Sequence, residues 1–187
     1  MNSSKMHKKI LWITETAMML ALLVALQWAT SGLNNQFITG SCVNLVLAMT
    51  VLLVGLSSGL TVALISPVMA FLLNIAPQIV TVPAIMAGNA VFVLLLHYAA
   101  DPEGKQISRQ IAALVLAAVA KFAVLYLIVV KLICGPMAQS LLASGTLKQP
   151  MIAALTVKFS WPQLITALIG GAIALAVFPL LKKALKK

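Results

Sequence analysis

Negative charge is almost missing from this chain. Its 187 residues include only three acidic side chains, Glu15, Asp101 and Glu103. A carboxylate metal site or an acid–base catalytic pair is hard to build from so few acids. The sequence also lacks an HExxH motif, a Gly-rich nucleotide loop and a P-loop. We therefore expect no metal, no cofactor and no enzymatic activity, and any ATP-driven step would need another protein.

Charge of either sign is scarce, and cysteine is too. Only 9% of the residues are charged while 62% are hydrophobic, whereas about a quarter of a soluble chain is charged. The apolar runs are continuous, which predicts helices rather than the alternating strands of a membrane barrel. We expect an all-α membrane protein, one transmembrane domain over residues 1–187. Cys42 and Cys134 are too few for a disulfide scaffold; one bridge or two free thiols are both open.

Six transmembrane helices are predicted from the lengths of the apolar runs. The run 42–73 is too long for one span, and the glycines between 55 and 59 divide it in two. Polar segments at 31–39, 74–78, 100–109 and 134–160 are expected as loops. The first run also faintly resembles a cleaved signal peptide. The expected spans are about 10–30, 42–54, 60–73, 83–99, 109–133 and 161–181.

The positive charges lie at the ends of the chain. Lys5, Lys8 and Lys9 precede the first span, and four lysines, the last of them Lys187, follow the sixth. Basic residues that flank spans mark the cytoplasmic side of a membrane. The net charge of +10 therefore predicts both termini inside the cell (N-in/C-in) and contact with the lipid bilayer, and does not favour nucleic acid.

Small residues recur along one face of the first span. Ala17, Ala21 and Ala25 are four residues apart and share a helix face. Such a flat ridge allows another helix to pack closely. It has two interpretations, ordinary packing within the bundle or a docking surface for a different membrane subunit.

A lysine in the fifth span is the strongest candidate for ligand binding. Lys121 lies 12 residues beyond Arg109, near the expected bilayer middle, where a charge is expensive and usually faces a cavity or a partner. Either Lys121 reaches toward the membrane surface or pairs with Glu15, or it waits for an anionic ligand. Lys131 and Lys158 would give the outer entrance the same sign.

Amide and aromatic side chains gather in the outer half of the predicted bundle. Amides offer donors and acceptors, and aromatic rings offer stacking faces, which suits a polar ring compound. Each residue alone also fits helix packing or, for Trp161, an interfacial aromatic belt. With the three lysines, the substrate-binding candidates are Asn35, Asn44, Asn74, Gln78, Asn89, Tyr126, Trp161 and Gln163.

Together these features resemble the substrate-binding S component of energy-coupling factor (ECF) vitamin transporters. The size, the six N-in/C-in spans and the alanine motif of the first span carry the resemblance, and the polar loop 31–39 matches a loop that closes over the outer site. It implies a bacterial cell membrane, a transmembrane coupling protein that docks on Ala17, Ala21 and Ala25, and two cytoplasmic ATPases. The chain would capture a small, anionic micronutrient. A stand-alone oligomeric carrier and a ligand-free scaffold are the alternatives.

Overall fold

All the regular secondary structure of the residues that the structure describes is helical. The computed structural model describes residues 3–75, 78–101 and 106–184. Parts of the expected loops 74–78 and 100–109, together with Lys186 and Lys187, lie outside these ranges. The elements are α1 (Ser3–Ser31), α2 (Gln36–Leu53), α3 (Leu56–Leu72), the 3-10 helix η1 (Ile79–Thr81), α4 (Val82–Ala99), α5 (Ile107–Leu125), the π-helix η2 (Tyr126–Ile133), α6 (Ala138–Ala143), α7 (Gln149–Lys158) and α8 (Trp161–Ala184).

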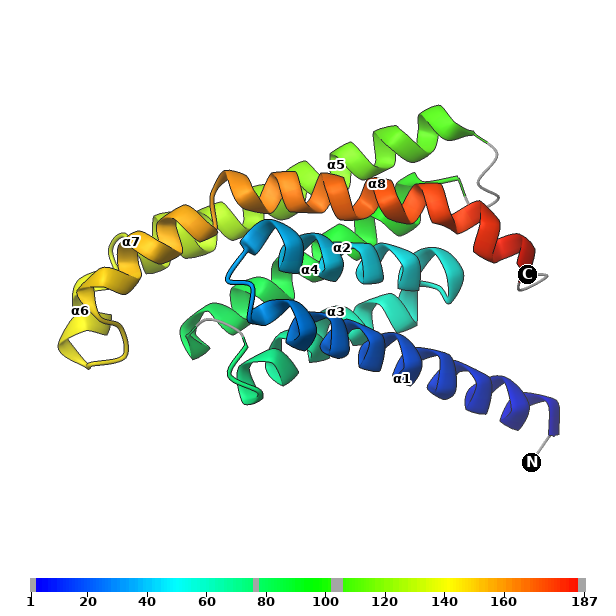
Figure 1. The fold of residues 1–187 in the computed structure, drawn as a ribbon, viewed down its shortest axis with the longest axis horizontal. Coiled ribbons are helices and arrows are strands. Elements are labelled where there is room, and N and C mark those ends of the chain that lie inside the picture. The colour runs from blue at the N-terminus through cyan, green and yellow to red at the C-terminus, as the bar shows by residue number, and fades with distance from the viewer. Residues whose placement is uncertain (1–2, 76–77, 102–105, 185–187) are drawn as a thin grey trace.

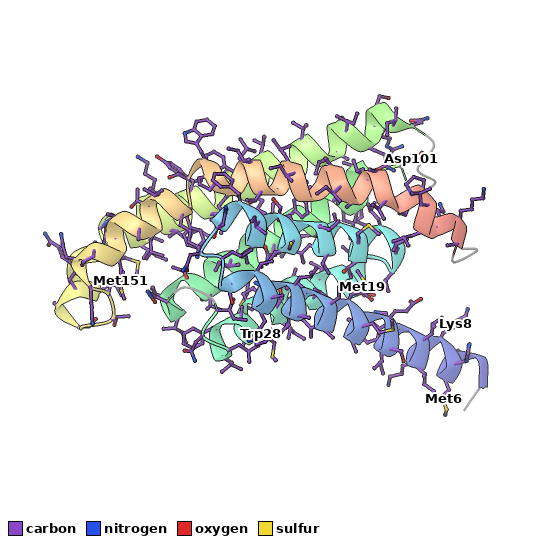
Figure 2. All side chains as sticks on the ribbon, viewed as in Figure 1. Met6, Lys8, Met19, Trp28, Asp101 and Met151 are labelled. Atoms are coloured by element: carbon purple, nitrogen blue, oxygen red, sulfur yellow. The ribbon has the colours of Figure 1, made fainter. Side chains whose placement is uncertain are left out.

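The long helices run back and forth along one bundle (Figure 1). Both chain ends lie at one end of the bundle, and α6 and α7 extend beyond the other end. Figure 2 shows Lys8 and Asp101 at the end that holds the termini and Met151 at the opposite end. α2 packs on α1, α3, α4 and α8, and α5 packs on α4 and α8. The start of α1 projects away from the other helices.

Five of the helical segments are long and apolar enough to cross a bilayer. They comprise α1, α2, η1 with α4, α5 with η2, and α8. α3 has 17 residues, which extend about 25 Å at 1.5 Å per residue, slightly less than a hydrocarbon core of about 30 Å. Large apolar side chains such as Met18, Leu72, Leu116 and Leu180 are exposed on the outside, which is what a helix surface facing lipid needs.

The apolar run 42–73 is divided by a turn at Gly55, as the sequence predicted. Gly55 has φ 116°, a conformation that favours glycine because a Cβ would be strained there. The N–H groups of Val54 and Gly55 both donate to the Thr50 carbonyl. Gly59 is not part of the turn, because it lies inside α3 against Val51 and Val93.

Two expected loops are shorter than the sequence indicated. The Asn35 side chain accepts a hydrogen bond from the Phe37 N–H (2.9 Å) and caps α2, so that Gln36–Thr39 is helix and not loop. Between α5 and α8, α6 and α7 replace the expected loop. Leu155 and Phe159 from the end of this segment bury their side chains in one cluster with Val129 and Ile133 of η2.

Candidate functional site

Lys121 is buried inside the bundle and is held by amide groups from two other helices. Its side chain is 2% exposed. The Nζ atom donates to Asn44 Oδ1 of α2 at 2.5 Å and to Asn89 Oδ1 of α4 at 2.7 Å. It also lies 5.4 Å from the centre of the Phe92 ring, a cation–π distance. Small neighbours on α5, among them Ala117 and Ala118, leave room for this arrangement.

Lys121 determines the orientation of the Asn44 and Asn89 amide groups. An ammonium group only donates, so both asparagine oxygens face it and both Nδ2 groups point elsewhere. Asn44 Nδ2 donates to the Gly40 carbonyl at 2.9 Å and to Thr166 Oγ1 at 3.4 Å. Asn89 Nδ2 is buried and has no partner. Three of the predicted residues, from α2, α4 and α5, therefore form one polar cluster.

This cluster lines a cavity that we call the lysine cavity. Its volume is about 100 Å³, measured as the space open to the centre of a water molecule. Because one water needs roughly 10–15 Å³ of such space, the cavity has room for several waters or a compact molecule. Leu125 and Phe159 contribute apolar wall. The polar side chains that line it are Gln27, Gln36, Thr39, Asn44, Ser66, Asn89, Lys121, Lys158 and Gln163.

A second and wider hollow adjoins the lysine cavity, and we call it the vestibule. Its volume is about 650 Å³ by the same measure. Its walls come from the α1–α2 connection, including Asn35, and from α7, including Val157. Gln36, Thr39 and Lys158 line both spaces. The segments that line the vestibule lie away from the end of the bundle that holds the termini (Figure 1), so the vestibule forms an approach to Lys121 from the opposite end.

The titratable side chains of the lysine cavity are basic. Lys121 and Lys158 line it, and no acidic side chain does among the residues that the structure describes. Lys158 closes α7, and its backbone carbonyl accepts a hydrogen bond from Gln163 Nε2 at 3.1 Å. Burial lowers the pKa of the Lys158 ammonium below its ordinary value because the charged form loses hydration. Both lysines would gain from an anion in this space.

Three predicted residues lie outside the lysine cavity on the surface of the bundle. Trp161 is 68% exposed and stacks on Phe122, with ring centres 5.7 Å apart. Tyr126 contacts the same Phe122 ring, and the exposed Lys131 places its Nζ 5.6 Å from the centre of the Tyr126 ring. These side chains form an external aromatic group on α5, η2 and α8. They do not line the lysine cavity, and their part in substrate binding stays a prediction.

Three further candidates have local roles in the structure. Asn35 caps α2 and lines only the vestibule. Asn74 is exposed and has φ 54°, a left-handed turn conformation that asparagine tolerates. Gln78 precedes η1, and its Nε2 lies 3.5 Å from Met151 Sδ of α7. None of the three lines the lysine cavity.

Some cavity residues carry little signal in the sequence. Gln27 and Gln36 stand out only as amides near the ends of apolar runs. Thr39 and Ser66 are ordinary helix residues by composition, and Phe159 is one apolar residue among many. Pro67 inside α3 offers a weak clue to Ser66, since a proline removes a backbone donor within the helix.

The alanine face of α1 is turned away from the bundle. Ala17, Ala21 and Ala25 are all exposed, whereas Thr16 and Leu23 on the other side of the helix are buried. Thr16 Oγ1 forms a hydrogen bond of 2.7 Å with Ser58 Oγ of α3. Within the described part of the chain the stripe is thus exposed, which favours its interpretation as a docking surface over packing inside the bundle.

Comparison of the chain with family models, with curated proteins and with solved structures finds no match. The arrangement must therefore be interpreted from its chemistry. Both cysteines are free thiols, and no group of three metal-ligating side chains occurs among the described residues. What the site offers is a buried cation, amide donors and acceptors, and an approach from one end.

Proposed function

We propose that this chain captures a small anionic micronutrient as the substrate-binding subunit of an ECF-type importer in a bacterial cell membrane. The observation that carries the proposal is the lysine cavity, a positive space with free polar atoms inside a bundle of apolar helices. In this proposal α3 also crosses the membrane and brings the number of spans to six, both termini are cytoplasmic, and the vestibule opens to the outside. Pantothenate, lipoate, nicotinate, biotin and folate have the required charge.

Two further features support a subunit rather than a complete transporter. The chain has no nucleotide-binding motif, so uptake driven by ATP would depend on partner ATPases. The exposed alanines of α1 form a flat strip on which a helix of a coupling protein can pack. The proposed assembly contains this chain, one transmembrane coupling protein and two cytoplasmic ATPases.

The alternatives make different use of the same features. A ligand-free scaffold has no need for a cavity in which buried polar atoms lack partners, because such atoms cost free energy. A stand-alone carrier would use the cavity but would need no docking face on α1. The competing accounts therefore differ in partners and in the energy source for uptake.

The docking surface is tested by enlarging Ala21. Ala21→Leu places a branched side chain in the middle of the strip, and we expect it to abolish co-purification of the coupling protein and ATPases from native membranes. Uptake by cells should be lost with it. Ligand binding and melting temperature should stay at wild-type values, since Ala21 is exposed and away from the cavity.

Ala172→Leu is the matched control, because Ala172 is an exposed alanine of α8. It should leave co-purification and uptake intact. Unchanged uptake by the Ala21→Leu variant would contradict the proposal. Transport by the purified chain alone in liposomes would favour the carrier instead.

A further inference from the structure

The lysine cavity has a free hydrogen-bond donor next to its cation. Asn89 is 1% exposed and lines the cavity. Its Oδ1 is bound to Lys121, so the unpaired buried group is the amide Nδ2. An unpaired buried donor costs free energy, and a ligand that accepts a hydrogen bond from it removes this cost.

Lys121 keeps a donor of its own. An ammonium group has three N–H donors, and the Asn44 and Asn89 oxygens accept from two of them. The remaining N–H and the Asn89 Nδ2 donors belong to adjoining groups. Two neighbouring donors, one of them charged, match the two oxygens of a carboxylate.

Gln27 requires a hydrogen-bond donor on the ligand, whereas Lys121 and Asn89 require an acceptor. Its Oε1 atom is buried without a partner, and Gln27 lines the same cavity from α1. A carbonyl oxygen only accepts, so a carboxylate gains nothing there. The group that satisfies Gln27 Oε1 is an O–H or N–H of the ligand. Among the described residues, four buried polar side-chain atoms lack partners, and these two belong to the cavity lining.

We propose that the ligand is a compact carboxylic acid that also carries an O–H or N–H donor, with its carboxylate at Lys121 and Asn89 and its donor at Gln27. This inference rests on the proposed capture function and narrows its substrate class. The carboxylate end fits the lysine cavity, and a longer ligand would extend into the vestibule through Gln36 and Lys158. Acids without a second polar donor leave Gln27 Oε1 unpaired.

Binding to the purified full chain, measured by calorimetry, tests the class. Pantothenate and biotin are the donor-bearing acids, with a carboxylate and O–H or N–H donors. Lipoate and nicotinate are the donor-free acids, with a carboxylate and no such donor. Pantothenyl alcohol and biotin amide are the uncharged probes, which lack the carboxylate. We expect a donor-bearing acid to bind about tenfold or more tighter than either donor-free acid. The uncharged probes should not bind.

A substitution at Gln27 tests the role of its acceptor. Gln27→Met removes the acceptor at similar size, so the preference for the donor-bearing acid should fall about tenfold while lipoate affinity stays unchanged. Gln27→Glu keeps an acceptor and should keep the preference with weaker binding of all acids. Gln139→Met, at an exposed glutamine of α6, is the control and should change nothing.

The outcomes separate this inference from the capture function. If donor-free and donor-bearing acids bind equally, or if Gln27→Met weakens both alike, the inference is overturned and capture of an anion stands. If uncharged probes bind as tightly as the acids, or no acid binds, the anionic substrate of the proposed function is overturned too.

Discussion

Lys121 is the residue on which the site depends, and its surroundings compensate its charge only in part. Removing an ammonium from water costs several kcal/mol even after the protein relaxes. Each hydrogen bond from a charged group to an amide returns about 1.5–3 kcal/mol, and Lys121 makes two of them. An anion would add direct charge compensation in a medium of low dielectric constant. The site is thus complementary to a negatively charged ligand.

Lys158 should make ligand binding sensitive to pH. Its lowered pKa means that it loses its proton at a lower pH than an ordinary lysine does. A carboxylate ligand stays ionised at neutral and alkaline pH. Raising the pH therefore removes attraction and weakens binding, and we expect affinity to fall about threefold more in wild type than in Lys158→Arg between pH 7 and pH 10.

The arginine variant keeps its charge over this range, and Lys121 is present in both proteins, so the difference reports Lys158. Calorimetry or tryptophan fluorescence over the pH series provides the measurement. Identical pH profiles for the two proteins would remove the Lys158 charge from the site.

The chemistry of each site residue determines whether it could be predicted from the sequence. Lys121 is visible because a charge inside an apolar run is costly, and Asn44 and Asn89 are visible as amides in such runs. Trp161 and Lys131 satisfy the same criteria but face outward. Composition does not show how a helix is rotated about its axis when all its faces are apolar. The lipid-facing side and the buried side then have similar residues.

At the scale of helices, the close approach of α2 and α8 determines the position of Asn44. A Cβ on Gly170 would lie 2.3 Å from the Ser41 carbonyl oxygen and 2.7 Å from the Leu45 nitrogen. These are backbone atoms, which cannot move aside without shifting α2. Gly170 is therefore needed for this crossing.

Gly170→Ala should push α2 and α8 apart and lower the stability of the bundle by about 1–3 kcal/mol. Ligand affinity should fall as well, because Asn44 moves away from Lys121. Thermal melting in detergent and calorimetry measure the two effects. The control is Gly32→Ala, at a glycine whose added Cβ meets nothing within 4 Å; equal melting temperatures for the two variants would contradict this account of the α2–α8 contact.

The long helices were predictable and the short ones were not, for a physical reason. Spans such as α4 and α8 follow from continuous apolar runs with prolines near their starts, Pro83 and Pro162. α6 and α7 are short and surrounded by turn residues, including Gly145, so the sequence resembles a loop. Their helices depend on tertiary packing, such as that of Leu155 and Phe159 on η2.

At the scale of the whole molecule, the account requires six crossings with both termini in the cytoplasm. Single cysteines in a background without Cys42 and Cys134 test this. Asn74→Cys, after α3, should react with an impermeant maleimide in intact cells. Ser57→Cys, at the start of α3, and Lys183→Cys, near the C-terminus, should react only after the cells are opened.

Labelling of Asn74→Cys and Ser57→Cys from the same side would show that α3 does not cross. Labelling of Lys183→Cys in intact cells would reverse the orientation of the C-terminal end. Either result would contradict the topology on which the approach to Lys121 from outside depends.

The central claim is that the buried ammonium of Lys121 holds an anionic molecule, and native mass spectrometry of Lys121→Met tests it most directly. Methionine has a similar volume and no charge, but it leaves the buried Asn44 and Asn89 oxygens without their donor, so the bundle should stay folded with a lower melting temperature. Lys131→Met, at an exposed lysine outside the cavity, is the control. We predict that wild type and the control retain a small acid after gentle purification, and that Lys121→Met retains none; an equally loaded Lys121→Met protein would contradict the account.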